Sequence, residues 1–222
     1  MALGRDLGDI EGRKLTMELK EALNELRKLE KRKFAQSIDL LISLKGIDVK
    51  KDNIATIVTV PNKIKDKKVC GFLTKRTPVV DTVTNLEFPK YKDKKELKKL
   101  VKNYDFFIAA APLMPSVATT FGKVLGPTGK MPSPQLGVLP NEDEKAISAL
   151  LERIEKAVKI RVKEAAVKVS VGNESMTDEQ IMANVMAIYN GLVNVLPIKK
   201  DNVKKVLIKL TMSKPLKVEM KQ

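Results

Sequence analysis

Residues 38–45 read Ile-Asp-Leu-Leu-Ile-Ser-Leu-Lys, and this stretch indicates how the ends of the chain fold. Every second residue from Ile38 to Leu44 is a large aliphatic, and polar residues stand between them except at Leu41. Successive side chains of a strand point to opposite faces, so a period of two predicts a strand with one buried face. The opposite face is expected to be polar and open to solvent.

Both ends of the chain show the same sequence pattern, in which amphipathic helices accompany strands of alternating apolar and polar residues. Residues 13–31 are predicted to form a helix, because leucines recur at steps of three and four between Glu and Lys. Residues Thr177–Gln180 form a capping box, in which a hydroxyl and an amide bond free N–H groups where a helix begins. Alternating apolar residues predict further strands over these segments: 54–60, 158–162, 167–171 and a final strand at 206–210. We therefore expect the two ends to fold together as an α+β domain. Its helices should cover one face of an antiparallel-type sheet and leave a basic face open.

The middle of the chain has a different sequence pattern, with continuous apolar runs in place of alternation. Compact apolar runs at Val69–Leu73 and Asp105–Ala110 indicate buried strands. Helix patterns alternate with them over three segments: 92–102, 116–124 and 142–157. Gly126–Pro140 is dense in Gly and Pro and is predicted to be mostly irregular. Such alternation predicts a small α/β unit with a partly parallel sheet.

The predicted organisation is therefore of the α/β class with two domains. One discontinuous domain is formed by residues 1–63 and 157–222, and residues 64–156 form a second domain inserted within it.

The charge of the chain points to a polyanionic partner. The 222 residues include 42 Lys+Arg and 27 Asp+Glu, a formal net charge of +15. Such an excess favours binding to nucleic acid or to an anionic membrane surface. No apolar run approaches the roughly 18 residues that a membrane span needs, so no membrane-spanning segment is predicted. We expect nucleic acid and no membrane partner. The single cysteine, Cys70, lies in an apolar run and is expected to be a buried thiol in a reducing cytosol.

Enzyme chemistry is disfavoured, because the sequence contains no histidine. The commonest general base and metal ligand is thereby missing, and zinc sites built from Cys and His are excluded. We predict no catalytic residue, no cofactor and no metal site.

A phosphate-binding loop is suggested by the glycine-rich run Gly122–Met131 but does not match in detail. The motif requires Gly-x-x-x-x-Gly-Lys-[Ser/Thr] and follows a strand. Here Val124 stands at the first glycine position, and Met131 replaces the hydroxyl that would bind magnesium. The run also follows a predicted helix. A nucleotide-dependent or RNA-modifying enzyme built on the middle domain is thus the alternative class of function, and it is disfavoured.

A basic surface is the stronger candidate site. The residues expected on the open sheet face are Lys168, Ser170, Lys205, Lys209 and Thr211, and those at the entry to the first strand are Lys33, Phe34 and Ser37. RNA recognition combines lysines for phosphates, hydroxyls for 2′-OH groups and apolar surfaces for bases. Each lysine alone could equally belong to a solvated strand face, and Phe34 to the core, so only the combination favours RNA binding.

Six stretches resemble one family in particular. They follow the family's order along the chain: Lys33–Ser37, Asp105–Ala109, Leu113–Pro115, Leu125–Pro132, Val171–Gln180 and Thr211-Met212. The family is ribosomal protein one of the large subunit (the "L-one" family), especially its archaeal branch. The resemblance covers residues 33–218, nearly the whole chain.

The resemblance implies an RNA-binding domain made of both termini and an inserted Rossmann-like domain. It implies a structural, non-enzymatic protein that belongs to the cytoplasmic ribosome and is a monomer when it is not bound there. Its partners would be the mobile rRNA stalk beside the tRNA exit site and, transiently, the deacylated tRNA whose release it assists. It would also repress translation by binding a mimic of the stalk in the leader or coding region of its own mRNA. A repressor acting outside the ribosome is a further alternative that would use the same site.

The family's RNA contacts carry over to Lys33, Phe34, Ser37, Lys168, Thr211 and Met212. Lys205 and Ser213 complete the predicted site. Ser213 stands where the family usually has glycine, so its side chain is expected either to crowd the RNA or to add a contact. Thr128 replaces a usual arginine, which argues against an RNA contact from the inserted domain.

Overall fold

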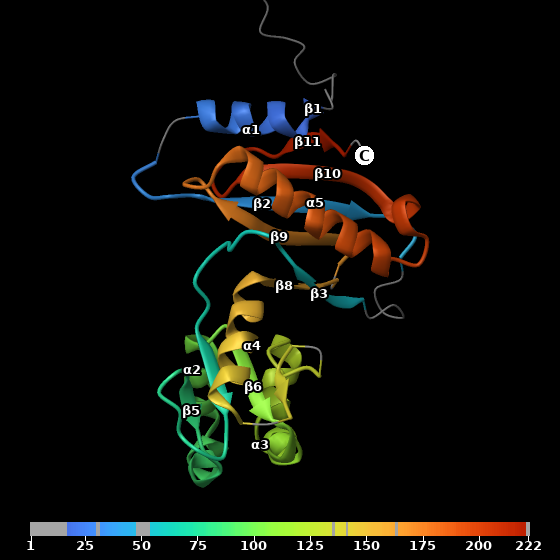
Figure 1. The fold of residues 1–222 in the computed structure, drawn as a ribbon. Coiled ribbons are helices and arrows are strands. Elements are labelled where there is room, and N and C mark those ends of the chain that lie inside the picture. Colours follow the sequence, from blue (N-terminus) through green and yellow to red (C-terminus); the bar gives the residue numbers. More distant parts are fainter. Residues whose placement is uncertain are drawn as a thin grey trace, which may run out of the picture. The chain divides into compact units, whose positions relative to one another are not determined.

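The computed structural model describes residues 17–29, 32–47, 54–134, 136–140, 142–162 and 164–220. The chain divides into two compact units. Unit 1 combines Met1–Ile64 with Val158–Gln222, and unit 2 is the intervening Lys65–Ala157. The boundaries between the units fall after residues 64 and 157, each one residue later than the boundaries after 63 and 156 that were expected from the sequence. The content of helices and strands is of the α/β class, as predicted (Figure 1).

The main sheet of unit 1 has the strand order β1-β11-β10-β2-β9. These strands are β1 (Met17–Glu18), β11 (Leu216–Glu219), β10 (Val203–Leu210), β2 (Ser37–Leu44) and β9 (Ala166–Asn173). The pair β1–β11 is parallel and the other pairs are antiparallel. Residues of β2 alternate strictly between buried and half-buried, which confirms the period of two in the sequence. Strand β11 was not predicted, so the strand at 203–210 is not the final one.

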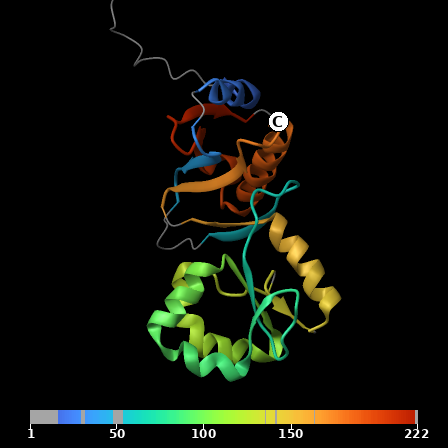
Figure 2. The same ribbon diagram turned by 90° about the vertical axis from the view of Figure 1, so that its left-hand side faces the viewer.

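One face of this sheet is covered by α1 (Leu19–Lys28) and α5 (Asp178–Val195), which bury Leu23, Leu26, Ile181, Val185 and Ile188 with the apolar sheet residues. In Figure 2, α5 lies on one side of the sheet only. The capping box at the start of α5 is present: the Thr177 hydroxyl accepts from the Gln180 N–H and the Gln180 side chain accepts from the Thr177 N–H. The predicted helix over 13–31 is too long, because Met17–Glu18 pair with β11 and the helix ends at Lys28. Residues 13–16 and 30–31 lie outside the described residues.

A second, two-stranded sheet packs against α5. It consists of β3 (Ala55–Thr59) and β8 (Ala157–Arg161) and does not extend the main sheet. Val58 approaches α5 so closely that a Cβ at Gly191 would lie 2.6 Å from Val58 Cγ2. A 3-10 helix, η3 (Lys199–Asn202), then leads from α5 into β10.

Unit 2 is built on a fully parallel sheet of order β5-β4-β6-β7. Its strands are β4 (Val69–Phe72), β5 (Asp81–Val83), β6 (Phe106–Ala110) and β7 (Val138–Leu139). The helical segments are η1 (Asn85–Lys92), α2 (Lys94–Asn103), η2 (Ala111–Leu113), α3 (Met114–Thr128) and α4 (Glu144–Lys156). Four phenylalanines at its centre, Phe72, Phe88, Phe107 and Phe121, stack or meet edge to face.

The glycine- and proline-rich segment is more regular than predicted. Helix α3 continues through Gly126 and Pro127 to Thr128, whose hydroxyl donates to carbonyls of the preceding turn. Gly129 then ends the helix with φ 74°, a left-handed conformation that favours glycine. The Lys130 ammonium donates to the Val101 and Tyr104 carbonyls and so caps α2. A phosphate-binding loop is excluded here, since most of the run is helical and its lysine is engaged in the fold.

Within the described parts of the chain, no helix is both long enough and apolar enough to cross a membrane.

Candidate nucleic-acid interface

The candidate interface lies where β2 begins and β10 ends, and two hydroxyl groups meet there. Ser37, the first residue of β2, and Thr211, which follows β10, are 174 positions apart in sequence. The Thr211 N–H donates to the Ser37 carbonyl at 3.0 Å, and the two hydroxyl oxygens lie 3.1 Å apart. Thr211 is exposed and Ser37 is half-buried. The antiparallel register of β2 with β10 therefore places a pair of hydroxyls at one end of the sheet.

Buried beneath these hydroxyls, Gln36 holds three segments together. Its side-chain oxygen accepts from the Met212 N–H at 3.3 Å, and its own N–H donates to the Glu174 carboxylate at 3.1 Å. The Glu174 N–H in turn donates to the Gln36 carbonyl at 2.9 Å. Buried polar groups are shielded from water and therefore form hydrogen bonds to other protein groups. Here these hydrogen bonds fix the backbone next to Ser37 and next to Thr211. Gln36 was not predicted as part of the site, and its only signal in the sequence is its place within the motif Lys33–Ser37.

Two apolar side chains at this end project into solvent instead of packing in the core. The side chain of Phe34 is 54 % exposed and that of Met212 is 64 % exposed. The alternative that Phe34 belongs to the core is therefore wrong. Lys33, next to Phe34, is exposed as well. Exposed aromatic and thioether groups beside cations offer stacking and packing surfaces for bases and sugars.

The Ser213 side chain is turned inward to the protein backbone. Its hydroxyl accepts from the Leu210 N–H at 2.9 Å and lies 3.3 Å from the Leu210 carbonyl. These bonds close the turn that follows β10. Among the described non-glycine residues only Lys199 has a positive φ, so this turn does not require glycine at position 213. Together, Lys33, Phe34, Ser37, Thr211, Met212 and Ser213 are called the sheet-end cluster below.

Lys168 and Lys205 lie elsewhere on the open face of the sheet. Lys168 on β9 is opposite Leu41, four residues along β2 from Ser37. Lys205 is opposite Ser43, six residues from Thr211, or about 20 Å at the rise of a strand. Lys168 is largely exposed and its ammonium lies 3.7 Å from the Glu164 carboxylate. The cluster thus gathers six of the eight predicted residues, and these two lysines extend the basic surface along the sheet.

The open face is less uniformly basic than expected. Leu41 and Leu207 face each other in its middle, and Asp39 pairs with Lys209 on one side and Ser170 on the other. Burial raises the pKa of Asp39, and the positive charge of Lys209 lowers it in part. The face therefore combines an apolar centre and the Asp39 carboxylate with the lysines Lys168, Lys205 and Lys209.

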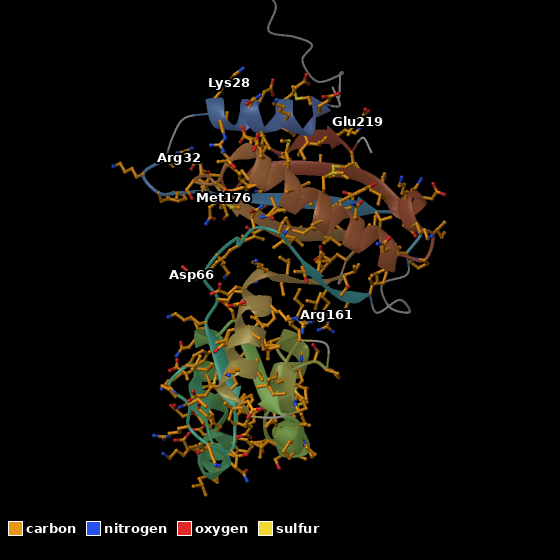
Figure 3. All side chains as sticks on the ribbon, in the orientation of Figure 1. Lys28, Arg32, Asp66, Arg161, Met176 and Glu219 are labelled. Atoms are coloured by element: carbon orange, nitrogen blue, oxygen red, sulfur yellow. The ribbon has the colours of Figure 1, made fainter. Side chains whose placement is uncertain are left out.

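Two arginines that were not predicted as part of the site, Arg27 and Arg32, also lie near the cluster. Arg27 on α1 donates to the Asp178 carboxylate at 2.6 Å and to the carbonyls of Glu174 and Met176. These bonds fix the β9–α5 connection against α1. Arg32 is exposed, and Figure 3 shows it at the same end of unit 1 as Met176, with Glu219 at the opposite end. Among the described residues, no group of three or more His, Cys, Asp or Glu side chains is arranged to hold a metal ion.

Comparison with known proteins agrees with this architecture. The model of the "Ribosomal protein L1p/L10e family" matches residues 26–214. Large ribosomal subunit protein uL1 of Methanocaldococcus jannaschii is 38 % identical over 213 residues, covering 90 % of this chain and 94 % of the relative. The uL1 proteins of Thermofilum pendens and Pyrobaculum calidifontis are 36 % and 34 % identical, and each alignment covers 90 % of this chain and 92 % of the relative. Matched over most of its length by the family and its archaeal members, the chain belongs to the ribosomal protein L1p/L10e family.

Proposed function

We propose that this protein is a structural rRNA-binding component of the large ribosomal subunit and that unit 1 binds the RNA. The observation that carries the proposal is the sheet-end cluster. Phe34 and Met212 are exposed near Ser37 and Thr211, whose hydroxyls meet, and the side chain of the buried Gln36 accepts from the Met212 N–H. The relatives are named as large-subunit proteins, which supports the ribosome as the place of action.

Each part of the cluster is suited to a different feature of RNA. Lys33 in the cluster and Lys168 farther along the sheet neutralise phosphates, whereas the Ser37 and Thr211 hydroxyls bond 2′-OH groups. Phe34 and Met212 pack on base and sugar faces. A regular RNA duplex hides those faces in its grooves, so the target is an irregular, folded RNA surface.

The rRNA target that we propose is the mobile stalk beside the tRNA exit site, where the protein contacts deacylated tRNA transiently and assists its release. A stalk mimic in the leader or coding region of its own mRNA would bind the same cluster and repress translation. Recognition by shape supports this second role, because any RNA that presents the same surface fits. We propose a monomer outside the ribosome, with no membrane partner.

Substitution of Met212 tests the placement of the site. Met212→Asp removes an exposed packing surface and adds a negative charge against RNA, so we expect at least a hundredfold loss of affinity for a large-subunit rRNA stalk fragment in a gel shift. Ile198→Asp is the matched control, because Ile198 is a similarly exposed apolar residue of unit 1 beyond the end of α5. Wild-type affinity of the Met212 variant, with its circular dichroism unchanged, would place the RNA elsewhere.

Two further measurements separate the proposed roles. The slope of log affinity against log salt should be about −0.7 to −0.9 per neutralised phosphate. A footprint on large-subunit rRNA should protect one stalk, and the protein should co-sediment with large subunits. Binding to its own mRNA without co-sedimentation would instead favour the repressor outside the ribosome.

A further inference from the structure

Beside the sheet-end cluster lies a groove of about 420 Å³, bordered by the end of α1 and the turn that joins β10 to β11. Leu26 and Leu210 form its buried base, and Leu29 and Met212 form exposed walls. The groove shares Met212 and Ser213 with the cluster and is also bordered by Gln36, so it continues the candidate interface. Its volume falls in the range of about 300–1,000 Å³ typical of small-ligand pockets.

The walls of the groove are suited to a flat apolar ring. Leu29 is 48 % exposed and, with Met212, gives the groove two apolar walls that are open to solvent. A nucleobase that leaves the RNA stack can insert between apolar side chains and bury both of its faces.

The rim of the groove carries charges of both signs. Arg32 and Lys214 are exposed on it and can bond the phosphates on either side of an inserted base. Glu25 is also exposed on the rim, and no described residue forms a salt bridge or hydrogen bond with its carboxylate. A carboxylate repels a polyanion unless it accepts hydrogen bonds from it. In RNA the base edges and the 2′-OH groups can donate such bonds, but only a base edge can offer two adjacent donors.

Among the four bases, guanine matches a carboxylate best. Its Watson–Crick edge presents two adjacent donors, the N1–H and the N2 amino group, which the two oxygens of a carboxylate can accept together. Adenine, cytosine and uracil place at most one donor beside an acceptor, which a carboxylate repels.

We propose that this groove receives an extruded guanine of the bound RNA, with Leu29 and Met212 packing on the ring and Glu25 accepting from its Watson–Crick edge. The inference rests on the proposed RNA-binding function and adds a base-specific contact to recognition that otherwise depends on shape.

Free nucleotides test the groove without RNA. The full-length protein, carrying a ¹³C-labelled Met methyl group, is titrated with 5′-GMP, 5′-AMP, 5′-CMP and 5′-UMP while the Met212 signal is followed by NMR. We expect a saturable shift with 5′-GMP at a dissociation constant at least threefold lower than with the other three. Equal shifts with all four nucleotides, or none with 5′-GMP, would overturn the proposal.

A second test is whether one substitution weakens or strengthens binding to the rRNA stalk fragment. Glu25→Gln should weaken RNA binding about tenfold and abolish the 5′-GMP preference, since a good bidentate base contact accounts for about 1–3 kcal/mol. Glu21→Gln is the matched control, because Glu21 is exposed on the same helix and does not border the groove. If Glu25 is only a repulsive surface charge, its removal will strengthen RNA binding, and the proposal fails.

These outcomes are distinguishable from failure of the proposed function. If wild-type protein binds the stalk and Met212→Asp does not, while Glu25→Gln and Leu29→Ser bind like wild type, the groove proposal fails and the function stands. If wild-type protein does not bind rRNA, the function fails, and the nucleotide titration alone decides whether the groove binds guanine.

Discussion

At the scale of single residues, Asp39 shows how the open face of the sheet balances charge against burial. It lies opposite Lys209 and Ser170, one row away from the apolar pair Leu41 and Leu207. Burial disfavours its ionised form and raises its pKa, and the nearby lysine compensates only in part. The ionised carboxylate is thus a cost to the folded state.

This raised pKa predicts a pH-dependent effect of Asp39→Asn. A pKa that is higher in the folded than in the unfolded chain contributes stability below the unfolded value of about 3.9, which is lost as the pH rises through the folded value. Asparagine carries no charge at any pH. The variant should therefore be more stable than wild type at pH 7, and this gain should shrink towards pH 3.5.

Urea unfolding at the two pH values, followed by a probe in unit 1, measures the gain. Asp201→Asn is a suitable control, because Asp201 is an exposed carboxylate of η3. An equal gain for Asp39→Asn at both pH values would show that burial of the charge is not the cause.

At the scale of elements, α5 is a helix packed from two sides. The main sheet lies against one side and β3 approaches the other, where a Cβ at Gly191 would lie 2.6 Å from Val58. This contact explains a glycine in the interior of a long helix, where alanine would normally be favoured by about 1 kcal/mol.

Gly191→Ala should therefore destabilise unit 1 by about 1–3 kcal/mol, the usual cost of forcing extra atoms into a packed core. Gly122→Ala on α3 is the matched control, since no atom lies within 4 Å of a Cβ there, and it should stabilise by up to about 1 kcal/mol. Chemical denaturation measures both, and Val58→Ala should rescue the Gly191 variant. A stabilising Gly191→Ala would contradict the close packing.

Local signals explain which elements could be predicted. The alternation in β2 and the capping box of α5 are complete within a few residues, so both elements were found. Strands β1, β5 and β11 have two to four residues, too few to show a period, and their strand form depends on a neighbour. Pro127 misled the prediction for α3, because it lies in the last turn, where Thr128 and Gly129 satisfy the carbonyls.

At the scale of the whole molecule, unit 1 holds both a core and the complete candidate interface. Among the described residues, its hydrophobic core is formed by members of the segments 22–64 and 160–218. All members of the sheet-end cluster lie in the same unit. Unit 2 has its own parallel sheet and aromatic centre.

Residues 1–64 joined by a short linker to 158–222 should therefore fold and bind the rRNA stalk. We expect an affinity within about tenfold of the full chain and an unchanged salt slope, because the phosphate contacts are retained. Gel shifts at several salt concentrations compare the two proteins. A fragment that folds but binds no better than a generic basic protein would show that unit 2 takes part in binding.

The sequence by itself determined the alternating pattern of the strands, the basic charge, the absence of histidine and the motif residues that bear on the proposed function. Those properties are local or additive, so they can be predicted without knowing which segments of the chain contact each other. Only the tertiary structure decided that Ser37 meets Thr211 across 174 positions and that Gln36 is buried between Glu174 and Met212. It also decided that Phe34 and Met212 are exposed and that Leu41 and Leu207 interrupt the basic face. Such contacts depend on the register between strands from opposite ends of the chain, which the folded core selects as a whole.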